Sequence, residues 1–164
     1  MDTGLVRRTG AGYSIGPATV ELASTFLRSD DTVQRFREFV PEMDALSAET
    51  AQLATLIESD VLFLARHDGT QPIALTSTIG KRLPASSTAI GKAMLAQLEP
   101  AELAATVTEP LPRLTERSHR NLESLSQDLA AIQRRGHAID DQEAAPNVVC
   151  LAVAVETREG DPRF

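Results

Sequence analysis

The sequence predicts an α+β fold in which a mostly antiparallel sheet is flanked by helices. Short apolar or alternating runs, typical of strands, are interleaved with longer runs of helical periodicity. Turn signals separate several strand-like runs so closely that they favour hairpins. With 164 residues, of which 42% are hydrophobic, the chain has the length and apolar content of about one globular domain.

The composition excludes several classes of protein. The net charge of −7 argues against generic nucleic-acid binding by the chain as a whole. No apolar run reaches the roughly 18 residues of a membrane helix, and the N-terminus has no signal-peptide pattern. A single cysteine excludes a disulfide scaffold, and no Cys/His group has zinc spacing. We therefore expect a cytoplasmic protein without cofactor, metal or membrane contact.

The first thirty residues predict a hairpin followed by a helix. Residues 5–8 and 13–15 are β-type runs with a Gly-containing link between them. Pro17 suits the first position of a helix that ends near Asp30. Asp31 is expected to cap a second helix, with a kink or break at Pro41. Because a lone hairpin is marginal in water, the first one is expected to be the tail of a larger unit.

The rest of the chain predicts strands interleaved with helices. Residues 52–58, 61–67 and 72–77 are expected to form three antiparallel strands joined by tight turns. Helices are expected from the hydroxyl residues at 86–88 to Ala96, from Pro100 to about Val107, and from an Asn121 cap to Gly136. Two further strands are expected, at 137–142 and 148–155. A turn signal at 158–161 has no return strand, so both ends of the chain look cut.

The candidate ligand site begins with three successive hydroxyl residues, Ser86, Ser87 and Thr88, at a predicted helix N-terminus. They suit a small anion through free N–H groups and the helix dipole, although ordinary capping would use one of them. Asp140 shares a strand face with Ala138, so its carboxyl is expected to point inward. A buried carboxylate needs polar partners, and a polar pocket would supply them.

Catalytic motifs are lacking, so the chain is not expected to be an enzyme. Gly91-Lys92 resembles the end of a phosphate-binding loop, but Ala93 follows where Ser or Thr is needed. The three histidines fit surface structural roles. Cys150 could be a nucleophile, yet its apolar neighbours supply no cation to lower its pKa, which favours a small buried hydrophobe.

Four segments in order together resemble the IclR family of bacterial transcriptional regulators. They are Gly4-Leu5-Val6-Arg7-Arg8 with Gly12-Tyr13-Ser14-Ile15-Gly16; Arg82-Leu83-Pro84-Ala85-Ser86-Ser87-Thr88-Ala89-Ile90-Gly91-Lys92-Ala93; Gly136-His137-Ala138-Ile139-Asp140-Asp141-Gln142-Glu143; and Cys150-Leu151-Ala152-Val153-Ala154-Val155. The resemblance implies a winged helix-turn-helix, a linker helix and a GAF-like effector-binding domain. Residues 1–15 would be the wing hairpin remnant, 16–29 the linker helix, and 30–164 the effector domain without its C-terminal part.

The resemblance also implies partners and site residues. A small organic acid or similar metabolite would be the effector, operator DNA would be bound through the mostly absent N-terminal domain, and the protein would be a homodimer or homotetramer. The implied ligand contacts are Ser86, Ser87, Thr88, Ala89, Asp140, Val148 and Cys150, and Arg7 and Arg8 are the surviving DNA contacts. The sequence departs from the family pattern at Ser86, where His is common, and at residues 145–147 and Ala154.

Two other functions remain as alternatives. The chain could be a stand-alone GAF-type sensor that acts through protein contacts, but such a sensor has no use for the Arg7-Arg8 hairpin. It could also be a thiol enzyme that uses Cys150, in which case alkylation of that cysteine at neutral pH would be fast.

Overall fold

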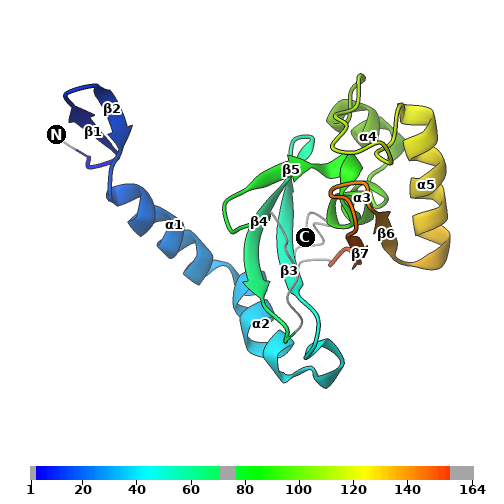
Figure 1. The fold of residues 1–164 in the computed structure, drawn as a ribbon, viewed down its shortest axis with the longest axis horizontal. Coiled ribbons are helices and arrows are strands. Elements are labelled where there is room, and N and C mark those ends of the chain that lie inside the picture. The colour runs from blue at the N-terminus through cyan, green and yellow to red at the C-terminus, as the bar shows by residue number, and fades with distance from the viewer. Residues whose placement is uncertain (1–2, 71–76, 156–164) are drawn as a thin grey trace.

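The computed structural model describes residues 3–70 and 77–155. An antiparallel hairpin, β1 (Val6–Thr9) and β2 (Gly12–Ile15), is followed by the helix α1 (Ala18–Ser29). Figure 1 shows the hairpin at the far end of α1, so that the two form an arm that reaches away from the remaining elements. The hairpin and the helix predicted from the first thirty residues are both confirmed.

The second helix begins at Asp31 as predicted, but its cap lies one residue earlier than predicted. Asp30 has extended backbone angles, and its side chain accepts the N–H of Val33 at 2.9 Å, so Asp30 is the N-cap of α2 (Asp31–Phe39). The prediction of Asp31 as the cap was therefore wrong, because two adjacent aspartates offer the same local signal. The predicted break at Pro41 is confirmed by two short 3₁₀ turns, Val40–Glu42 and Asp44–Leu46.

The first sheet has three antiparallel strands in the order β3 (Ala51–Ile57), β4 (Asp60–His67) and β5 (Arg82–Pro84). The strands predicted at 52–58 and 61–67 are confirmed. Most of the strand predicted at 72–77 lies outside the described residues. The third strand of the described sheet is β5, which the sequence indicated only as the approach to a helix.

A short central helix follows the first sheet. After a 3₁₀ turn (Ala85–Ser87), Thr88 caps α3 (Ala89–Leu95). The helices α4 (Pro100–Thr106) and α5 (Leu122–Arg135) come next; α5 begins after the Asn121 cap and ends at Gly136, whose φ of 78° is left-handed. All three predicted helices in this region are confirmed, together with both boundary residues of α5.

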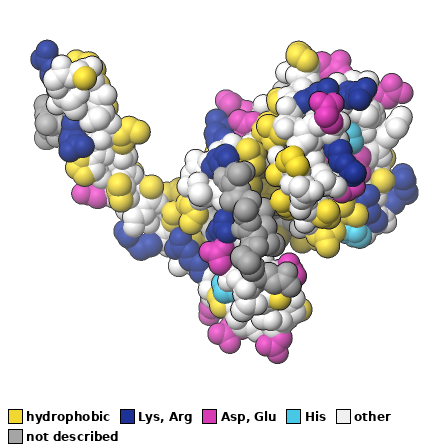
Figure 2. Space-filling model, in the orientation of Figure 1, with side chains coloured by type: hydrophobic (Ala, Val, Ile, Leu, Met, Phe, Trp, Pro, Cys, Tyr) yellow, Lys and Arg dark blue, Asp and Glu magenta, His cyan; other side chains and the backbone are white. Residues whose placement is uncertain are grey.

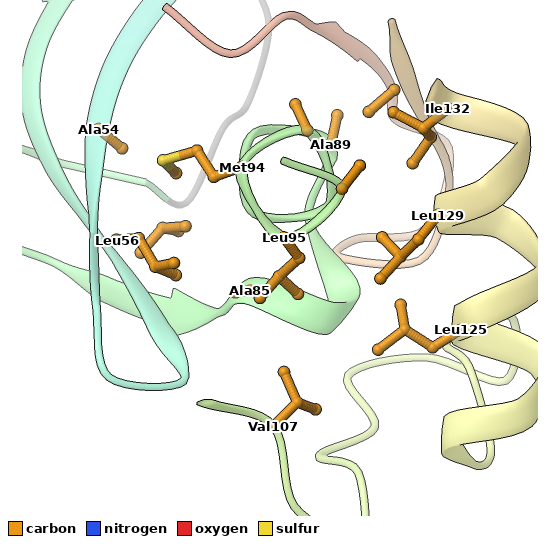
Figure 3. Close-up of a cluster of buried hydrophobic side chains, with 14 of the residues drawn as sticks. Ala54, Leu56, Ala85, Ala89, Met94, Leu95, Val107, Leu125, Leu129 and Ile132 are labelled. Atoms are coloured by element: carbon orange, nitrogen blue, oxygen red, sulfur yellow. The ribbon is translucent and has the colours of Figure 1, made fainter. Parts of the chain in front are cut away.

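The second sheet pairs β6 (Ala138–Asp141) with β7 (Val149–Ala152) in antiparallel register, so that Asp140 lies opposite Cys150. Helix α3 packs against β6, β7 and α5 and also contacts the first sheet. Figure 3 shows Met94 directed from α3 toward Ala54 and Leu56 of β3, with Leu129 and Ile132 of α5 on the other side of the helix. The main core is thus built around α3.

A second, smaller core joins α2 to the first sheet through Val33, Leu53, Leu64 and Ala65. By contrast, the arm carries large apolar side chains on its surface, as Figure 2 shows. These exposed residues include Tyr13, Ile15, Val20, Leu22 and Phe26. Among the described residues, no helix is both long and apolar enough to cross a membrane.

Candidate functional site

The three hydroxyl residues before α3 are all buried, but two of them have structural tasks. The Thr88 side chain accepts the N–H of Gly91 at 3.0 Å and so caps the helix. The Ser87 hydroxyl donates to the carbonyl oxygen of Pro112 at 3.1 Å, which ties the turn to a distant loop. Ser86 is 3% exposed, and its hydroxyl has neither of these two structural tasks. Ser86 is therefore the member of the run that remains most suited to a ligand.

Asp140 points inward as predicted and is only 2% exposed. Its Oδ1 accepts the backbone N–H groups of Glu143 at 2.6 Å and of Ala144 at 3.2 Å, so its partners come from its own turn. Burial raises the pKa of the Asp140 carboxyl above its ordinary value, and the negative charge of Glu143 adds to this, although the two N–H bonds and Lys92 oppose it. A ligand that forms a hydrogen bond with Asp140 would therefore meet a carboxyl group that is poorly solvated.

Cys150 is half-buried and lies opposite Asp140 in the β6–β7 ladder. Burial, together with the nearby Asp140 charge, raises the pKa of the thiol from its ordinary 9.0 to about 11. A thiol with that pKa is almost wholly protonated at neutral pH, which argues against a nucleophile. The side chain instead packs against the main core, as the sequence favoured.

The structure brings the two halves of the predicted ligand site into one region. Helix α3, which begins with Ala89, packs against both β6 and β7. Ala89 and Cys150 take part in the same apolar cluster, and half-buried Val148 immediately precedes β7. The ligand contacts themselves remain a prediction. Arg7 and Arg8 are both exposed on β1, where alternate residues face opposite sides of the hairpin.

A buried charge cluster beside this region was not predicted from the sequence. Lys92 on α3 is 0% exposed, and its Nζ donates to Asp128 Oδ2 at 2.7 Å and to Glu143 Oε1 at 2.5 Å. A lysine surrounded in its helix by small and apolar residues is a sequence signal for burial, and a lysine that is buried must be paired. That signal was present at Lys92, but the sequence gave no indication of its partners.

His119 also belongs to this cluster, which corrects the expectation of a surface role. Its side chain is 17% exposed, and its Nε2 lies 3.4 Å from Asp128 Oδ2 and 3.6 Å from Glu143 Oε2. Arg135 approaches the other oxygen of Asp128 at 3.4 Å. Burial alone would raise the pKa of the Asp128 carboxyl, but Lys92, Arg135 and His119 together hold it below its ordinary value.

Hydrogen bonds fix the loop that carries His119 against the turn after β6. The Ser118 hydroxyl donates to the carbonyl oxygen of Glu143 at 2.8 Å and accepts the N–H groups of Leu114 and Thr115. The Thr115 hydroxyl donates to the carbonyl oxygen of Gln142 at 2.7 Å. A shallow surface hollow lies over this junction, and the described residues that line it include none of the predicted ligand contacts.

Comparison with known proteins places this α+β unit among bacterial transcriptional regulators. The sequence model of the family described as "Bacterial transcriptional regulator IclR C-terminal" matches residues 24–163. The chain therefore belongs to the IclR family, through that C-terminal domain. The resemblance carried by the four sequence segments is confirmed, and so is the α+β fold class.

Individual relatives agree with this assignment. The chain is 30% identical over 150 residues to the HTH-type transcriptional regulator BhcR of Paracoccus denitrificans, a match that covers 91% of this chain and 54% of the relative. It is similar to the crystal structure of the repressor BlcR of Agobacterium tumefaciens, with 32% identity, a TM-score of 0.75, and 96% and 63% of the two chains covered. These relatives are named as regulators, which agrees with the expectation that the chain is not an enzyme.

A third relative has been solved with a ligand. It is an IclR homolog from Microbacterium hydrocarbonoxydans complexed with 4-hydroxybenzoate, with 25% identity and a TM-score of 0.75. The match covers 96% of this chain and 66% of that one. The chain spans about half of the BhcR relative's length and under two thirds of the BlcR chain.

Proposed function

We propose that this chain is the effector-binding part of a ligand-responsive transcriptional regulator, in which a small organic acid or similar metabolite alters binding to operator DNA. The observation that carries the proposal is the family match over residues 24–163, which includes both sheets and the core around α3. The 4-hydroxybenzoate complex of a relative supports an acid as the class of effector.

The proposed effector site lies between the start of α3 and the β6–β7 strands. Ser86, Ser87, Thr88 and Ala89 would contact the polar head of the ligand, and Asp140, Val148 and Cys150 would close the other side. Two features support this arrangement: α3 packs against β6 and β7, and the buried Ser86 hydroxyl has neither of the structural tasks of Ser87 and Thr88. Ser87 and Thr88 would then contribute through backbone groups, since their hydroxyls are engaged in the fold.

The arm is proposed to connect the effector domain to a DNA-binding domain. Residues 1–15 would be the wing of a winged helix-turn-helix, 16–29 a linker helix, and 30–164 would belong to the effector domain. Arg7 and Arg8 are exposed on the hairpin, where they would meet phosphates. The exposed apolar side chains of α1 favour a homodimer or homotetramer, and a regulator of this kind would act in the cytoplasm.

Ligand binding to the chain itself tests the effector site. We would measure the melting temperature of the chain with a panel of small aliphatic and aromatic carboxylic acids that includes 4-hydroxybenzoate. An acid that binds the native state raises the melting temperature in a saturable manner. Ser86→Ala and Asp140→Asn should each weaken that response, whereas Arg113→Ala in the surface hollow should not. A response that survives both site substitutions would place the effector elsewhere.

The coding sequence upstream of residue 1 tests the role in transcription. A helix-turn-helix pattern there supports the proposal, and the longer protein should then release operator DNA when the acid is added. If no such pattern precedes the hairpin, a stand-alone sensor that acts through protein contacts becomes the better explanation.

A further inference from the structure

We propose that His119, Asp128 and Glu143 form a binding site for a divalent transition-metal ion with the ligand preferences of Zn²⁺. One ligand atom from each of the three residues lies within 4.8 Å of the others. They come from three separate segments: the loop before α5, α5 itself, and the turn after β6. An imidazole with two carboxylates is a donor set that suits zinc, cobalt and nickel better than magnesium or calcium.

Within the part of the chain that the structure describes, two atoms of this cluster are buried without a hydrogen-bond partner, namely His119 Nε2 and Glu143 Oε2. Glu143 is only 8% exposed, and its Oε2 faces the imidazole nitrogen at 3.6 Å, which is too long for a hydrogen bond. A buried polar atom without a hydrogen-bond partner lowers the stability of the fold, because it has lost its contact with water and gained nothing in return. An ion between the two atoms would satisfy both at once.

The spacing of the atoms fits coordination to one ion. Ligands bound at about 2.0–2.2 Å in a tetrahedral arrangement lie about 3.4 Å apart. The imidazole nitrogen is 3.4 Å from Asp128 Oδ2 and 3.6 Å from Glu143 Oε2, so little movement would be needed. Three protein ligands leave one position of a tetrahedral ion for water or another small donor.

The nearby cations leave carboxylate lone pairs available to this ion. Lys92 binds Oε1 of Glu143, whereas the oxygen that faces His119 is Oε2, so the ammonium and the metal would use different atoms. Asp128 Oδ2 accepts from Lys92 but, as a carboxylate oxygen, has a second lone pair. Asp140 is a third carboxyl group near the cluster. Three carboxyl groups therefore face two cations, Lys92 and Arg135.

Titration of the chelator-treated chain with ZnCl₂ and CoCl₂ tests the site. We expect one ion per chain by isothermal titration calorimetry, a higher melting temperature with Zn²⁺, and a visible Co²⁺ absorption band of low coordination number. MgCl₂ should give none of these effects. Failure to detect Zn²⁺ or Co²⁺ binding would overturn the proposal.

Variants assign the binding to these residues. His119→Ala should lower the affinity for Zn²⁺ at least tenfold and remove the Co²⁺ band, while His137→Ala, at a matched half-buried histidine outside the cluster, should change neither. Glu143→Gln is the second test, because it keeps the side-chain volume if the alanine variant folds poorly. Cys150→Ser should retain the ion. Unchanged affinity in both cluster variants, or loss of the ion only in Cys150→Ser, would refute the site independently of the proposed effector function.

Discussion

The reactivity of Cys150 gives a quantitative test of the region between β6 and β7. The structure raises the pKa of this thiol from 9.0 to about 11. At pH 8 the thiolate fraction falls from roughly one tenth in the unfolded chain to about one thousandth in the folded one, because each pKa unit is a factor of ten. Alkylation proceeds through the thiolate, so iodoacetamide should react about 100-fold more slowly with the native chain.

The assay is the pseudo-first-order rate of iodoacetamide addition, followed by intact mass spectrometry, for the native chain and for the chain in concentrated urea. Between pH 8 and 10 the native rate should rise about tenfold per pH unit, whereas the unfolded rate should level off above pH 9. A native rate within about threefold of the unfolded rate at pH 8 would refute the reasoning and revive the thiol-enzyme alternative.

Asp140→Asn separates the two causes of the raised pKa. Burial is the larger cause and the Asp140 charge the smaller, so the variant should lower the pKa of Cys150 only part of the way back to 9.0. The native alkylation rate at pH 8 should then increase by less than about tenfold. An increase to the unfolded rate would mean that the charge, and not burial, controls the thiol.

Three further predictions concern stability and are measured by urea denaturation. Lys92→Met should lower the free energy of unfolding by about 3–5 kcal/mol, because it strands two poorly solvated carboxylates, whereas Arg113→Met at an exposed pair should cost less than about 1 kcal/mol. A Cβ at Gly91 would lie 2.3 Å from the backbone of the preceding turn, so Gly91→Ala should cost about 1–3 kcal/mol or more, whereas Gly10→Ala meets nothing within 4 Å and should be nearly neutral. Loss of the helix cap in Asn121→Ala should cost about 1 kcal/mol. If Lys92→Met were as stable as Arg113→Met, or Gly91→Ala as stable as Gly10→Ala, the explanation given for that pair would be wrong. An Asn121→Ala variant with unchanged stability would contradict the capping role of Asn121.

Local signals explain why much of the fold could be predicted. Helix α5 was predicted at both ends because its cap, its apolar period and its terminal glycine all act within a few residues. The orientation of Asp140 followed from strand alternation in the same way. The exception was the N-cap of α2, where Asp30 and Asp31 present identical chemistry and only the backbone angles distinguish them.

Long-range partners explain what the sequence left open. Ser87 belongs to a hydroxyl run that local reasoning could assign to capping or to a ligand, but its hydroxyl binds Pro112, 25 residues away. Strand β5 is only three residues long and exists through its pairing with β4. Lys92 is the strongest case, because its carboxylate partners lie 36 and 51 residues further along the chain.

The paired charges hold together the two segments that carry the proposed effector contacts. Thr88 begins the helix that contains Lys92, and Asp140 accepts the N–H of Glu143 in the turn after β6. The bond from Lys92 to Glu143 therefore connects the start of α3 to that turn. Apolar packing alone tolerates small shifts, whereas a buried ammonium that loses its carboxylate is left unpaired at a cost of several kcal/mol, about 3–5 in comparable cases. The spacing across the proposed effector site is for this reason fixed more tightly than the surrounding alanine-rich core could fix it by contact alone.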